Sequence, residues 1–199
     1  AYDMPNCGEE EREKFYTSLM SNCILLIGDF FNYDMIINSP EFENSISQLL
    51  YNIKCPKSLI SCSAIEGTIK AIKISPQNTI DMIFEENFFP DLISILSKDE
   101  EFNGNDELFG QVNLISEQSK NQQLDQENIK IGILNLIYFI IKYDKQNKYF
   151  FQIVESIPDQ LHMLMQKSEN FQIKSLKILL ILSQSLSSDE QNALFKFEG

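Results

Sequence analysis

One segment of this chain occurs twice, and that repeat constrains the fold more than any other feature. Residues 126–143 read QENIKIGILNLIYFIIKY and resemble residues 167–186, KSENFQIKSLKILLILSQSL, after a shift of 42 positions. The aligned pairs are Glu127 with Glu169, Asn128 with Asn170, Ile131 with Ile173 and Leu134 with Leu176, and the apolar runs 136–140 and 178–182 also align. Repeated helical units of this length are typical of an α-solenoid, whose units stack to share one core.

Two further landmarks recur in the same order. The pair Gln-Asn occurs at residues 77, 146 and 191, each time before a short apolar stretch. The first two copies lead into an apolar residue followed by Pro and Asp, at residues 89–91 and 157–159. Pro suits the first turn of a helix, and Asp there interacts favourably with the helix dipole. We therefore expect short helices over 40–51, 78–86, 90–96 and 158–165, and long helices over 10–31, 58–74 and 126–143, with Ser39 as the N-cap before Pro40.

The chain resembles the armadillo family in its helix triplets, its apolar-Pro-Asp starts and the segment Leu134-Asn135-Leu136. HEAT repeats are a close second resemblance. The resemblance implies an all-α, right-handed solenoid of about three repeats plus a partial N-terminal repeat. Pro5 and Gly8 indicate a tail at residues 1–8, and the resemblance implies a single solenoid domain over 9–199. The family usually has Gly before its Pro-Asp start; Asn87 and Ser156 stand near that place here. Asn87 can replace Gly in the left-handed backbone conformation.

An insertion interrupts the repeat. Pro90 and Pro158 are 68 positions apart instead of 42, and the surplus is acidic and polar. We expect a loop insertion at 98–125, in which the apolar stretch 108–115 docks on its own solenoid or on a partner. Acidic residues at 99–107 have part of the spacing of a calcium loop, but Gly110 occupies the place of the bidentate Glu, so we expect no metal site.

Composition excludes several classes of function. The net charge of −13 disfavours nucleic acid and anionic membrane surfaces, which attract basic proteins. The apolar run 131–141 is too short to cross a bilayer, so we expect no membrane insertion. A single histidine, His162, leaves no His-based catalytic or metal set, and the four cysteines lack CxxC spacing. We expect reduced and buried cysteines, no enzyme activity, no cofactor and a cytoplasmic or nuclear location.

In armadillo proteins the third helices line a concave groove that holds ligands. On 126–143 a polar stripe at steps of three and four residues should face solvent there. With its equivalents in the other repeats, it predicts a partner-binding groove formed by Lys70, Lys73, Asn128, Asn135, Lys142, Lys174 and Lys177. The aligned positions on 58–74 also include Ser63 and Glu66, which should face solvent, and Glu66 is the one acidic residue among the aligned positions. The resemblance gives Asn135 the position that often holds an extended peptide backbone.

These residues predict a non-catalytic protein-interaction scaffold, or a subunit of a multi-protein complex, with a protein partner whose bound segment is an acidic peptide. Two alternatives stay open for the lysines: exposed helix faces carry lysine in any case, or the groove holds the acidic insertion of the same chain. Two other roles follow from the resemblance, a chaperone cofactor that regulates an Hsp70 and a nuclear-transport-type cargo adaptor. The adaptor would need a groove rich in acidic residues with regularly spaced Trp and Asn, whereas this chain has no Trp and its predicted groove carries lysine.

Overall fold

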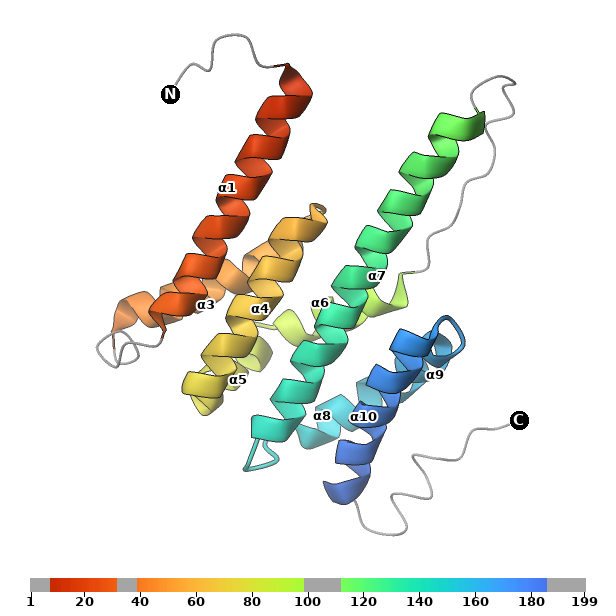
Figure 1. The fold of residues 1–199 in the computed structure, drawn as a ribbon. Helices are drawn as coiled ribbons and strands as arrows, with labels where there is room; N and C mark the ends of the chain where they lie inside the picture. Colours follow the sequence, from red (N-terminus) through yellow and green to blue (C-terminus); the bar gives the residue numbers. More distant parts are fainter. Residues whose placement is uncertain (1–7, 32–38, 99–111, 186–199) are drawn as a thin grey trace. The chain divides into compact units, whose positions relative to one another are not determined.

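The computed structural model describes residues 8–31, 39–98 and 112–185, the last range without the side chains of 112–122 and 185. Within these ranges the regular structure consists of nine α-helices and includes no strand (Figure 1). The all-α prediction is therefore confirmed. The contacts divide the chain into two compact units, Ala1–Ile83 and Phe84–Gly199. The predicted tail at 1–7 lies outside the described residues, and Gly8 caps the first helix.

The first unit contains α1 (Glu9–Phe30), α3 (Pro40–Ile53), α4 (Ser58–Ile74) and the larger part of α5 (Pro76–Glu85). These bounds agree with the predicted helices to within two residues. Ser39 is the N-cap of α3 and Pro40 lies in its first turn, as predicted. Proline is tolerated there because the first N–H groups of a helix have no partner inside it.

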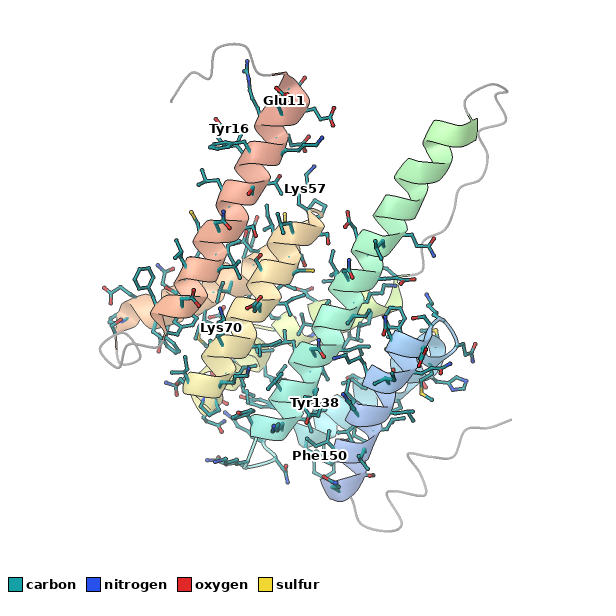
Figure 2. All side chains as sticks on the ribbon, viewed as in Figure 1. Glu11, Tyr16, Lys57, Lys70, Tyr138 and Phe150 are labelled. Carbon is teal, nitrogen blue, oxygen red and sulfur yellow. The ribbon has the colours of Figure 1, made fainter. Side chains whose placement is uncertain are left out.

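Helices α1 and α4 lie side by side and run in the same direction. Lys57 at the start of α4 pairs with Glu13 of α1, and Lys70 near its end pairs with Asp29 at 2.7 Å (Figure 2). Between these ion pairs the seam includes small residues beside Ile24. The hydroxyls of Ser21 and Ser63 are 2.7 Å apart and buried. A Cβ placed on Gly28 would lie 3.0 Å from the Cα of Gly67, so the two backbones approach each other closely.

The core of the first unit lies on the other side of α4. Helix α3 packs on α4 and buries Phe42, Ile46, Leu49, Leu50 and Ile53, which recur at helical spacing. The ring of Phe42 meets that of Phe31 edge to face, with 5.0 Å between centroids. Helix α4 is thus covered by α1 and by α3, which explains its long series of small and apolar buried residues.

The second unit contains α6 (Phe88–Ser97), α7 (Val112–Tyr143), α8 (Phe150–Ser156), α9 (Pro158–Met165) and α10 (Glu169–Ser185). The expected loop at 98–125 is wrong over residues 112–125, because α7 begins at Val112. This stretch contains no Gly or Pro and is rich in Leu, Glu, Gln and Lys, which favour helix. Residues 99–111, which include the calcium-like spacing and the first part of 108–115, lie outside the described residues.

Helix α10 packs against α7 and α9, and α7 also contacts α6. The buried face of α7 includes Ile133, Leu134, Ile137 and Ile140, each with no exposed surface. At the end of α7 the chain turns through Asp144, which is buried and accepts the backbone N–H groups of Lys148 and Tyr149 at 3.2 and 3.0 Å. This carboxylate fixes the start of α8.

Asn87 adopts the left-handed conformation, with φ of 61° and ψ of 31°, for which the sequence offered it only as a tolerable substitute for glycine. It connects α5 to α6, where the family pattern has glycine. A β-branched residue is disfavoured in this region, whereas glycine adopts it without steric cost.

We expect Asn87→Val to lower the free energy of unfolding by about 1–2 kcal/mol and Asn87→Gly to change it by less than about 1 kcal/mol. Urea denaturation followed by circular dichroism measures both. Asn44→Val, at an exposed position of α3, controls for the intrinsic helix preference of valine. Equal effects of the two valine variants would show that backbone conformation at residue 87 is unimportant.

Candidate partner-binding groove

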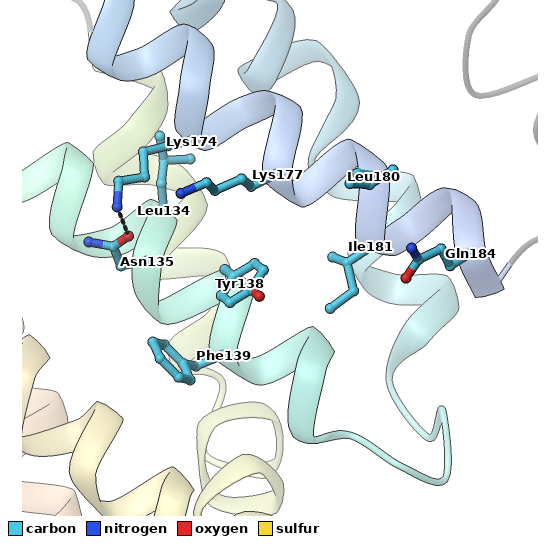
Figure 3. Close-up of a pocket in the computed structure, with 9 residues that line it drawn as sticks. All are labelled: Leu134, Asn135, Tyr138, Phe139, Lys174, Lys177, Leu180, Ile181 and Gln184. Carbon is cyan, nitrogen blue, oxygen red and sulfur yellow. Dashed lines mark hydrogen bonds between the residues drawn. The ribbon is translucent and has the colours of Figure 1, made fainter.

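A hollow of about 420 Å³ lies between α7 and α10 in the second unit (Figure 3). Helix α7 contributes Leu134, Asn135, Tyr138 and Phe139, and α10 contributes Lys174, Lys177, Leu180, Ile181 and Gln184. We call this hollow the α7/α10 groove. Its lining combines aromatic and aliphatic side chains with two ammonium groups and two carboxamides. It includes no carboxylate, although the chain as a whole has a net charge of −13.

The polar centre of the groove is the contact between Lys174 and Asn135. The ammonium group of Lys174 donates to Oδ1 of Asn135 at 2.6 Å, across the seam between the two helices (Figure 3). The carboxamide nitrogen of Asn135 carries two further N–H donors. Lys177 lies one turn farther along α10 and is exposed. Both lysines and the amide can therefore act as hydrogen-bond donors to an acceptor in the groove.

Aromatic rings extend the groove toward the end of α7. Tyr138 and Phe139 meet edge to face at 5.6 Å, and Phe139 stacks on Tyr143 at 6.1 Å. The ammonium group of Lys142 lies 5.9 Å from the centroid of each of these three rings. A cation at this distance is attracted to the face of an aromatic ring. Lys142 is exposed and thus adds a third positive charge beside the groove.

The structure brings together four of the seven residues that the sequence predicts for partner binding: Asn135, Lys174 and Lys177 line the groove, and Lys142 borders it. Asn128 is exposed on α7. Asn128 lies seven positions before Asn135, so the two residues are about 10 Å apart along the helix. It does not line the hollow.

The other two predicted residues, Lys70 and Lys73, belong to α4 in the first unit. Lys73 is exposed. Lys70 forms ion pairs with Asp29 at 2.7 Å and with Glu66 at 3.4 Å. The hydrogen bond to Asp29 raises the pKa of Lys70, and partial burial opposes that rise. Two carboxylates thus offset the charge of Lys70, which weakens the expectation that it attracts an acidic ligand.

Sequence reasoning missed three features of these surfaces. It placed Ser63 on the solvent-facing stripe of α4, but Ser63 is buried against Ser21 because α1 covers it. It also missed Asp29, since α1 had not been aligned with the later repeats. The separation of 42 residues between Ser21 and Ser63 would have supplied that alignment. Tyr138 and Leu180 were missed as lining residues because apolar residues on a helix face usually indicate core.

The hydrogen-bond donors of the groove are two ammonium groups, two carboxamides and the hydroxyl of Tyr138. Its lining has no carboxylate, histidine, cysteine or hydroxyl other than that of Tyr138. Across the described residues no three His, Cys, Asp or Glu side chains gather in a way that could hold a metal ion.

None of the described helices combines the length and the apolar character needed to span a membrane. No family model, curated protein or solved structure matches the chain.

Proposed function

We propose that this protein is a non-catalytic interaction scaffold that holds an acidic segment of a partner protein in the α7/α10 groove. The observation that carries the proposal is the composition of that groove. Two lysines line it, a third borders it, and no carboxylate lines it, in a chain with 29 acidic and 16 basic residues. Complementary charge of this kind steers an acidic segment to the site and excludes basic ones.

The lining suggests how each part of a peptide would bind. Carboxylates of the ligand would accept hydrogen bonds from Lys174 and Lys177, and a main-chain carbonyl would accept one from the amide of Asn135. An apolar side chain of the ligand would fill the space between Tyr138 and Ile181, as side-chain pockets do in extended-peptide recognition. The preferred segment is therefore acidic residues around one large apolar residue.

We further propose that the chain is an armadillo-like solenoid. Support comes from the helix order, in which the triplets α5–α6–α7 and α8–α9–α10 repeat a short, short, long pattern. It also comes from the long-helix contacts within each unit. Ser21 meets Ser63 across 42 residues in the first unit, and Asn135 meets Lys174 across 39 residues in the second. Stacking of equivalent long helices is the arrangement by which solenoid repeats share a core.

Fluorescence anisotropy tests the binding proposal. The probe is a fluorescein-labelled twelve-residue peptide of Asp and Glu with one central Leu, compared with versions in which Gln or Lys replaces the acidic residues. We expect the affinity to fall from the acidic to the neutral to the basic peptide. Binding of the acidic peptide should weaken at higher ionic strength. The double variant Lys174→Glu/Lys177→Glu should bind the acidic peptide about 30–100-fold more weakly.

The matched control is Lys54→Glu/Lys145→Glu, which makes the same change in net charge at exposed positions outside the groove. It should weaken binding by less than about threefold, through long-range repulsion only. If the control variant lost as much affinity as the groove variant, binding would reflect overall charge and not this site. Equal affinity for the acidic and neutral peptides would also contradict the proposal.

A further inference from the structure

Helix α1 exposes a large apolar surface. Six of its side chains are 46–58% exposed: Phe15, Tyr16, Leu19, Met20, Leu26 and Phe30. Tyr16 projects from the N-terminal half of the helix (Figure 2). The opposite face of α1 holds Ser21, Ile24 and Gly28 and is buried. Contiguous exposed apolar surface on a soluble unit usually marks an interaction site.

Four of these residues form a narrow stripe. With 3.6 residues per turn, Phe15, Leu19, Leu26 and Phe30 lie within about 60° of one another around the helix. Their order is the same in both directions along the chain: Phe, Leu, Leu, Phe. The two phenylalanines and the two leucines share one midpoint, between Asn22 and Cys23. We call these four residues the α1 stripe.

We propose that the α1 stripe pairs with the α1 stripe of a second copy of this chain, antiparallel and about a two-fold axis at residues 22–23. A two-fold interface requires that if one residue contacts another, the reverse contact also occurs. The α1 stripe meets this condition, because Phe15 would face Phe30 of the other copy and Leu19 would face Leu26. The small side chains of Asn22 and Cys23 at the midpoint allow the two helices to approach closely.

Area and charge are both consistent with such a pair. At half exposure each of the four side chains of the α1 stripe offers about 100 Å², so two copies would bury about 800 Å² of stripe surface, the size of a weak, reversible interface. Residues 15–28 include no charged side chain, and Asp29, which precedes Phe30, is paired with Lys70 at 2.7 Å. Two chains of net charge −13 can therefore meet at this part of the surface without facing carboxylates.

Sedimentation equilibrium of the full chain at about 1–100 µM tests the pairing, since this range brackets micromolar affinity. We expect a monomer–dimer equilibrium. Leu19→Glu/Leu26→Glu places two facing pairs of glutamates in the interface and should weaken dimerisation about 100-fold or more. Leu19→Lys/Leu26→Glu should dimerise far better than Leu19→Glu/Leu26→Glu. In the antiparallel register, and only there, the introduced lysine of each copy meets the introduced glutamate of the other. Leu124→Glu is the matched control, since Leu124 is 57% exposed on another helix and Leu26 is 55% exposed.

Cross-linking checks the axis. The prediction that the cysteines are buried is wrong for Cys23, which is exposed, and its equivalent in the second copy would lie close by across the two-fold axis. A short bismaleimide should trap a covalent dimer that Cys23→Ser abolishes and Cys55→Ser does not. Circular dichroism confirms that each variant folds. A monomer throughout the concentration range, or equal dissociation of both double variants at residues 19 and 26, would overturn the proposal, as would a dimer that persists in Leu19→Glu/Leu26→Glu.

Discussion

Gly28→Val is expected to lower the free energy of unfolding by about 3 kcal/mol, one of the two largest effects predicted here. A Cβ at residue 28 would lie 3.0 Å from the Cα of Gly67 and 3.3 Å from the Cδ of Lys70. The Gly67 contact is with backbone, which cannot rotate away as a side chain can. The two γ-methyl groups of valine would therefore force α1 and α4 apart. Separation would stretch the hydrogen bond between Ser21 and Ser63 and expose both hydroxyls.

Two comparisons isolate this steric cause. Gly28→Ala adds the Cβ alone, which needs a shift of a few tenths of an ångström and gains about 1 kcal/mol of helix propensity, so we expect a small net change. Ser18→Val, at an exposed position of α1, controls for the helix preference of valine. Urea denaturation gives the stabilities, and amide hydrogen exchange in α1 and α4 locates the loss. A Gly28→Val protein as stable as the wild type would contradict the close seam.

Asp144→Ala is the second change for which we expect a loss of about 3 kcal/mol. The Asp144 side chain is only 4% exposed and accepts the N–H groups of Lys148 and Tyr149. Alanine would leave both donors without this acceptor, and an unsatisfied buried donor costs about 1–3 kcal/mol. The loss should extend to neighbouring contacts, because the ring of Tyr149 stacks on Phe84 with 4.1 Å between centroids.

Asp144→Asn retains one carbonyl acceptor and the shape of the side chain, so it should lose about half as much stability. Asp159→Ala controls for removal of a carboxylate from an exposed first helical turn, which should cost less than about 1 kcal/mol. Thermal unfolding of the three variants, followed by circular dichroism, gives the order of their stabilities. An Asp144→Ala variant no less stable than Asp159→Ala would show that the turn is held by its packing and not by the carboxylate.

Local features of the fold were predictable because they depend on neighbouring residues. The bounds of α4 and α9 agree with the proline breaks and the apolar periodicity. The left-handed conformation of Asn87 followed from the residue type and its place before a helix start. The start of α7 was missed because polar, acidic composition was interpreted as loop. Helix propensity without a breaker over 112–125 was the better guide.

The candidate groove was predictable only in part. Periodicity indicates which side of a helix is polar, so Asn135, Lys174 and Lys177 could be assigned to one surface. It does not indicate which carboxylate lies opposite a given lysine. Lys70 therefore looked like a groove cation until α1 placed Asp29 2.7 Å from it. The binding role of the groove and the solenoid arrangement stay predictions until the peptide titrations and further structures test them.

The sequence by itself determined that the chain is helical, where most helices begin and end, and which face of each is apolar. These properties depend on contacts within about four residues, which repeat with the period of the helix. Only the tertiary structure decided what those faces meet. The contacts of Ser21 with Ser63, Asp29 with Lys70 and Asn135 with Lys174 join residues 39–42 positions apart. Such pairs depend on how closely two helices approach, and at the α1–α4 seam that distance depends on the absence of a Cβ at Gly28, which faces the backbone of Gly67.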